Sequence, residues 1–151
     1  MSSTRIAAAA AAGLAAMLAL LWVAMARVSR RRMREVQRDA WWILQVADTI
    51  SADVRQATEQ AASIPENDPV FDLIERLLAV EREANGLCAR PREVLASLPG
   101  TGLLTLWKQA RELRGIVLRL VLVRTQADMG MRQLGDLLAT GHVPSELAPL
   151  A

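Results

Sequence analysis

Aromatic, cysteine and histidine residues are scarce in this sequence. It has no tyrosine, one phenylalanine (Phe71), one cysteine (Cys88) and one histidine (His142). Because strands are enriched in aromatic and β-branched residues, whereas Ala and Leu dominate here, the composition favours helix over strand. A single cysteine cannot form a disulfide within the chain, which mildly favours a reducing compartment. We expect Cys88 to be a small buried hydrophobic residue.

Motifs for catalysis and for metal or phosphate binding are also missing. The sequence has no HExxH, no GxSxG and no GxxxxGK followed by Ser or Thr, so the glycines at Gly100 and Gly102 do not form a phosphate loop. His142 has no second histidine or thiolate cluster with which to hold a metal. We therefore predict that the protein is not an enzyme and has no cofactor. A carboxylate site assembled across helices is the remaining alternative.

One uncharged run, residues 6–26, follows a short N-terminal flank, residues 1–5. It contains 21 residues, 11 of them alanine, and as a helix it would span about 31 Å, close to the hydrocarbon thickness of a bilayer. Two interpretations are open: an uncleaved membrane anchor, or a signal peptide cut after the small residues Ala24 and Ala26. The run is longer than the usual apolar region of a signal peptide, which favours the anchor.

A basic collar, residues 27–38, follows the run at once. Arg5 is the only charged side chain before the run, whereas six arginines follow it: Arg27, Arg30, Arg31, Arg32, Arg34 and Arg38. Because short arginine-rich flanks stay in the cytoplasm, we predict a single-pass protein whose C-terminal domain is cytoplasmic. We expect the first five of these arginines to contact anionic lipid headgroups.

The excess of positive charge is confined to this end of the chain. Residues 39–151 hold 11 basic and 15 acidic residues, a net charge of −4, so the calculated pI of 9.4 reflects the collar. No aromatic or recognition-helix pattern accompanies the collar. We therefore expect no nucleic acid partner.

Apolar residues adopt a heptad rhythm after the collar. The positions are Val36, Ala40, Ile43, Ala47, Ile50, Val54, Ala57, Ala61 and Ile64. Alternating steps of four and three keep these side chains on one seam of a helix and predict packing against another helix. The flanking positions lack the opposite charges that select a partner chain, which favours a partner helix within the same chain.

Proline and glycine divide the remainder into helices. The stretch PENDP ends the first helix, with Asp68 as N-cap and Pro69 at the first helical position. We predict helices at about 69–89, 91–98 and 102–140, with a turn at 99–102 and a flexible tail at 142–151. In the second helix we expect Phe71, Ile74, Leu77, Leu78, Ala84 and Cys88 to face inward. The predicted fold class is all-α: a single-pass transmembrane helix followed by an antiparallel bundle of three to four helices over 33–141.

The last helix contains a conflict between charge and burial. Its apolar seam follows a similar rhythm of threes and fours, at Leu103, Leu106, Ala110, Leu113, Val117, Leu120, Arg124, Ala127, Met131, Leu134 and Leu138. Its run IVLRLVLV, residues 116–123, is apolar nearly all round and is expected to lie centrally, yet Arg119 interrupts it and Arg124 falls on the apolar seam. One interpretation is that both arginines extend to the surface. The alternative is a buried polar lock, with acidic partners among Asp48, Asp53, Glu75 and Glu81.

Trp41 and Trp42 are the most suggestive residues for function. Both lie outside the heptad seam, so they either pack against a second neighbouring helix or anchor a partner. We interpret the chain as a membrane-anchored interaction or scaffold subunit whose partners are the bilayer and another membrane or cytoplasmic protein, or a second copy of itself. Two alternatives are a sensory or regulatory input bundle coupled to the membrane helix, and a secreted helical protein.

Overall fold

The computed structural model describes residues 3–62 and 68–140, and these residues form four helices and no strand. The helices are α1 (Ser3–Ala61), α2 (Asp68–Leu87), α3 (Ala89–Ser97) and α4 (Leu103–Thr140). The prediction of an all-helical chain is confirmed. Residues 63–67, which include Ile64 and the first three residues of PENDP, lie outside the described residues, as do His142 and the tail.

The first helix is a single element of 59 residues, about 88 Å long. The sequence predicted a membrane helix and a heptad region as separate elements, whereas the structure joins them in one helix. No proline occurs between Ser3 and Ala61, and Gly13 is the only glycine, so nothing interrupts the helix. Among the described helices, α1 alone is long and apolar enough to cross a membrane, although a signal sequence has the same properties.

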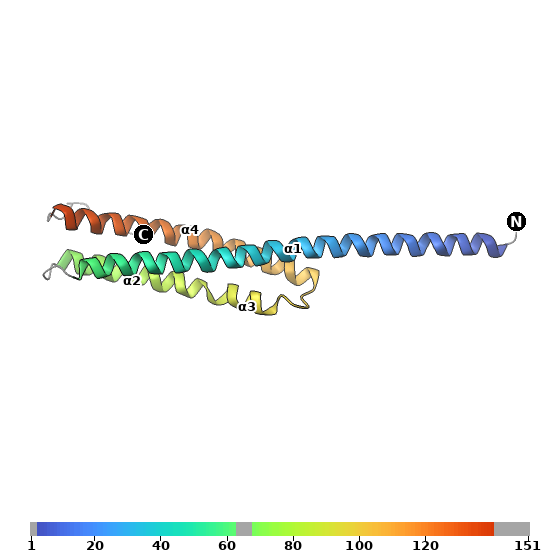
Figure 1. Cartoon of the computed structure of the whole chain (residues 1–151), viewed down its shortest axis with the longest axis horizontal. Coiled ribbons are helices and arrows are strands. Elements are labelled where there is room, and N and C mark those ends of the chain that lie inside the picture. Colours follow the sequence, from blue (N-terminus) through green and yellow to red (C-terminus); the bar gives the residue numbers. More distant parts are fainter. Residues whose placement is uncertain (1–2, 63–67, 141–151) are drawn as a thin grey trace.

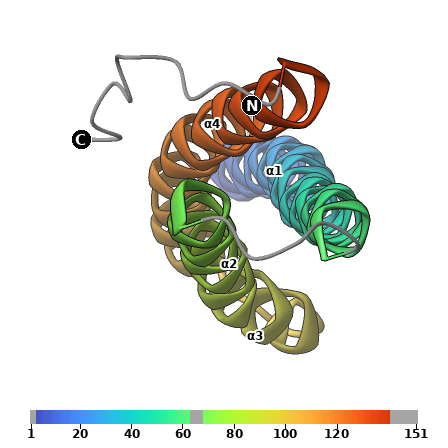
Figure 2. The ribbon, with the colours of Figure 1, turned by 90° about the vertical axis from the view of Figure 1, so that its left-hand side faces the viewer.

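The second half of α1 packs against the other three helices (Figure 1). Helices α2 and α3 run back along α1 toward the point where it leaves the packed helices, and α4 then runs in the same direction as α1. Seen end-on, α1, α4 and the α2–α3 pair surround a common centre (Figure 2). The first half of α1 protrudes, and its side chains from Ala12 to Met25 are exposed.

The core follows the predicted seams closely. All the α1 heptad positions from Val36 to Ala61 are buried except Ala57, which is half-buried. On α4, Leu106, Ala110, Leu113, Leu120, Ala127 and Leu134 are buried on the predicted seam. Cys88 is buried at the end of α2, as expected from the usual burial of free cysteine.

Two predictions about facing were wrong. On α2, Leu77 and Ala84 are buried as predicted, but Phe71 is 63% and Leu78 39% exposed. The buried row begins at Val70 and also includes Leu73 and Val80. Two adjacent apolar rows occur on this helix, and only the packing decides which one faces the core. The run 116–123 is not central either, because Leu118, Val121 and Leu122 on its outer face are exposed.

A tight turn joins α3 to α4, as the sequence predicted. Gly100 has φ +88°, a backbone conformation that glycine adopts without the steric cost of a side chain. The amide of Thr101 donates to the carbonyl of Leu98 at 3.2 Å, and the amide of Leu106 donates to the carbonyl of Gly102 at 3.0 Å. The chain therefore reverses within residues 98–103, next to the protruding half of α1 (Figure 1).

Candidate functional site: the collar, the start of α4 and the outer groove

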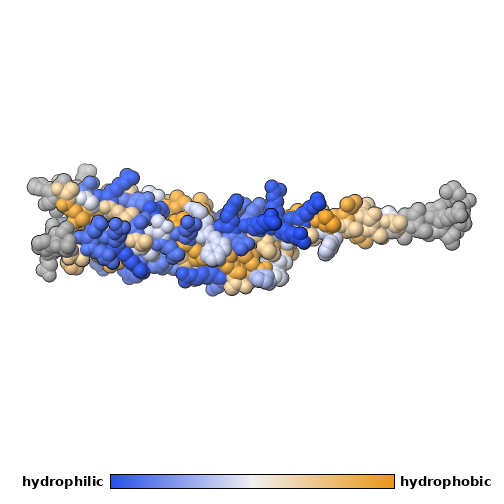
Figure 3. All heavy atoms as spheres, in the orientation of Figure 1, coloured by the Kyte–Doolittle hydropathy of each residue, from blue (hydrophilic) through white to orange (hydrophobic). Residues whose placement is uncertain are grey.

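The arginine collar lies where α1 passes from its protruding half into its packed half. Figure 3 shows a hydrophilic belt at this place, between the apolar protruding helix and the packed helices. Arg32 is half-buried and donates to Glu35 at 2.7 Å, whereas Arg27, Arg30, Arg31 and Arg34 are exposed. Within residues 3–62 and 68–140 these four exposed arginines form no ion pair, so their charges face solvent uncompensated.

The start of α4 adds further positive charge to the same level. The guanidinium of Arg32 lies over the ring of Trp107, 3.9 Å from its centroid, a cation–π contact that ties α4 to the collar. Lys108, Arg111 and Arg114 follow on α4 and line a hollow together with Arg32 and Trp107. Trp107 was not among the predicted site residues, because its contact with Arg32 joins two helices that are distant in the sequence.

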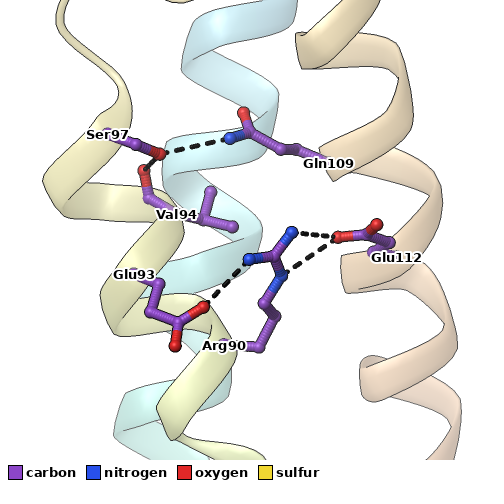
Figure 4. A network of polar contacts seen from close by, with 6 residues as sticks. All are labelled: Arg90, Glu93, Val94, Ser97, Gln109 and Glu112. Carbon is purple, nitrogen blue, oxygen red and sulfur yellow. Dashed lines mark hydrogen bonds and ion pairs between the residues drawn. The ribbon is translucent and has the colours of Figure 1, made fainter.

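A polar network fixes α3 to the first turns of α4 (Figure 4). Arg90 donates from Nε and Nη2 to Glu112 Oε2, at 3.1 and 2.8 Å, and from Nη1 to Glu93 at 2.9 Å. The hydrogen bonds to Glu112 and Glu93 raise the pKa of the Arg90 guanidinium. Gln109 donates to Ser97 Oγ at 3.2 Å. Both contacts join α3 to α4, so they hold together the two helices that flank the α3–α4 turn.

The two adjacent tryptophans on α1 are both at the surface. Trp41 is 58% and Trp42 40% exposed, so neither belongs to the core. Trp42 borders a hollow of about 480 Å³ between α1 and α4, whose other lining residues are Arg38, Asp39, Arg114, Val117 and Leu118. We call this hollow the outer groove. Leu122, one turn beyond Leu118 on α4, is 65% exposed and extends the apolar face.

The structure separates the two arginines that were candidates for a buried lock. Arg119 is 66% exposed and donates to Glu83 at 3.0 Å on the surface. Arg124 is half-buried and connects α4 to α1, with 2.9 Å from Nη1 to Asp53 and 3.1 Å from Nε to Asp128. Asp53 was one of the four predicted acidic partners. Exposed and half-exposed pairs of this kind contribute about 0–1 kcal/mol each.

The described residues offer little for chemistry. Among them, no group of three or more His, Cys, Asp or Glu residues is placed to hold a metal ion. Burial raises the pKa of the Cys88 thiol from its ordinary value of 9.0, partly opposed by the charge of Arg92. Since the thiolate is the nucleophilic form, Cys88 is chemically quiet in the folded chain.

Comparisons with protein-family models, with curated proteins and with solved structures each found no match to this chain. The inference about function therefore rests on the surface, charge and packing described above.

Proposed function

We propose that the chain is a membrane-anchored helical scaffold or interaction subunit. In this proposal, residues 6–26 of α1 span the bilayer once and the collar lies at the cytoplasmic headgroups. Residues 33–141 form an antiparallel helical bundle in the cytoplasm that presents the outer groove to a partner protein. The observation that carries the proposal is that α1 continues unbroken from a part whose side chains, from Ala12 to Met25, are all exposed to a part that packs against the other three described helices.

The protruding half of α1 requires a nonaqueous environment. Its large apolar side chains are widely exposed, with Leu20 at 70% and Trp22 at 74%. Exposed apolar surface costs about 25 cal/mol per Å² in water, and a contiguous apolar cylinder of this length is unfavourable unless it is covered. A bilayer covers all faces of a single helix at once, whereas a partner helix would cover only one.

The collar supports the proposed orientation. Six arginines occur within twelve residues on the C-terminal side of the apolar run, against Arg5 on the N-terminal side. Arginine-rich flanks of this length are retained in the cytoplasm. Arg27, Arg30, Arg31 and Arg34 are exposed and have no ion pair among the described residues, so they are available to anionic headgroups, each worth about 1 kcal/mol near the surface.

The test is the mass of the mature N-terminus together with a topology reporter fused after Ala151. We expect the apolar run to be retained in protein extracted from membranes and the reporter to be active only in the cytoplasm. Replacing Arg30, Arg31, Arg32 and Arg34 with glutamine should move part of the reporter to the other side. A mature protein beginning near Arg27 would establish the signal peptide instead, and reporter activity outside the cytoplasm in the unmodified chain would refute the orientation.

A further inference from the structure

The start of α4 lies at the same level as the end of the apolar run. Arg32 stacks on Trp107, and α1 and α4 run in the same direction, so this contact sets the register between them. Leu103, the first residue of α4, precedes Trp107 by about 6 Å along the helix axis and so lies level with Val28 of α1. The apolar run ends at Ala26. The α3–α4 turn is thus within one helical turn of the proposed membrane boundary.

Burial along α1 agrees with this register. Side chains from Ala12 to Met25 are exposed, and the first half-buried side chains are Ala26 and Ser29. The packed helices therefore begin where the proposed membrane span ends.

Side chains at the start of α4 change from apolar to basic with distance from that boundary. Leu104 is 86% exposed, more than any other large apolar residue in the described part of the chain, and Trp107 is 50% exposed. Lys108 and Arg111 follow, with Lys108 one turn after Leu104 on the same face of the helix. Tryptophan favours the membrane interface and basic residues favour anionic headgroups, so this order matches the change from acyl chains to headgroups.

The turn is also held in a fixed conformation. Arg90 and Ser97 on α3, which precedes the turn, bind Glu112 and Gln109 on α4, which follows it (Figure 4). A segment that is already ordered loses little conformational freedom when it binds. This preorganisation favours a docking role over that of a loose connection.

We propose that the α3–α4 turn is a second membrane contact, in which Leu104 and Trp107 insert into the interface of the bilayer that α1 spans while Lys108 and Arg111 face anionic headgroups. This inference rests on the proposed function, because α1 must bring the turn to the bilayer. It goes further by fixing the packed helices to the membrane surface at two points instead of one.

Tryptophan fluorescence tests the contact in the full chain, reconstituted into vesicles of phosphatidylcholine with phosphatidylglycerol. Three variants each keep one tryptophan, at 22, 41 or 107, with phenylalanine at the other three positions. Trp41 is the matched control, since it is 58% exposed but lies about 13 Å further from the membrane than Arg32. We expect lipids brominated near the headgroup to quench Trp107 clearly and Trp41 hardly at all.

Two further variants sharpen the result. In the chain whose only tryptophan is Trp107, Leu104→Asp should reduce quenching, whereas Leu118→Asp on the same helix should not. Quenching of Trp107 should be stronger in these anionic vesicles than in vesicles of phosphatidylcholine alone, and replacing Lys108 and Arg111 with glutamine should reduce this difference while the collar arginines remain. Quenching of Trp107 no stronger than that of Trp41, with Trp22 still quenched, would overturn the second contact and leave the anchor standing. An unquenched Trp22 would overturn both.

Discussion

Within one uninterrupted helix, the side chains from Ala12 to Met25 are exposed on every face, whereas the heptad positions from Val36 to Val54 are completely buried. Both halves are rich in alanine and branched apolar residues. They differ in where the charges lie: the run 6–26 has none, and the heptad region carries its charges off the seam. An all-round apolar surface suits lipid, and a single apolar stripe suits other helices. One continuous helix therefore has a surface suited to lipid in one part and a surface suited to helix packing in another.

The largest contrast between the halves concerns the stability of the packed helices. Ile50→Ala should lower the free energy of unfolding by about 2–5 kcal/mol, because it leaves a cavity in the core. Leu18→Ala in the protruding half should leave this free energy unchanged. The measurement is urea denaturation in mild detergent. The unfolded fraction is read from the alkylation of Cys88, which is buried only while the helices are packed. Equal losses from both substitutions would show that the two halves unfold together.

The reverse contrast concerns membrane insertion. Leu18→Asp should disfavour insertion by about 3 kcal/mol, because a carboxylate near the middle of the apolar run must enter the hydrocarbon. The measurement is the fraction of protein that remains in membranes after an alkaline wash. Leu118→Asp is the control, since Leu118 is 70% exposed on α4 and outside the apolar run. A wash-resistant Leu18→Asp protein would argue against a membrane span.

The tryptophans probe the outer surface of the packed half. Trp41→Ala and Trp42→Ala should each cost about 1 kcal/mol of stability or less, as is usual for surface positions. Truncation of a buried tryptophan would cost about 3–5 kcal/mol. The same urea measurement decides between these values. A cost in the higher range would mean that the tryptophans serve folding and are not available to a partner.

The smallest effect is expected from glycines within α4. Gly135→Ala should raise stability by about 0.8 kcal/mol, since alanine is the better helix former and the added methyl group meets no neighbouring helix within 4 Å. Gly130→Ala is the matched control, because its methyl group would lie 2.8 Å from Leu77 Cδ2 in the contact between α2 and α4. Thermal unfolding should separate the two variants. An equal gain at both positions would show that the α2–α4 contact is loosely packed.

Periodicity predicted the elements and two of the buried seams because heptad spacing is a local property. It failed in part on α2, where Val70 and Phe71 begin two adjacent apolar rows and the sequence does not show which one is buried. It failed again at Leu118, because the sequence does not show which face of α4 the other helices cover. Trp107 was missed for a third reason: its meeting with Arg32 depends on the register between two helices 75 positions apart in the chain.

The continuity of α1 also has a mechanical consequence. From Leu14 to Ala61 it contains neither proline nor glycine, so it has no obvious hinge between the proposed membrane span and the far end of the packed helices. Ala61 lies about 52 Å beyond Ala26 along this rod. A tilt of about 20°, typical of membrane helices, would displace that end sideways by about 18 Å. The helix acts as a lever arm, and a contact at the α3–α4 turn, close to its pivot, would limit how far the arm swings.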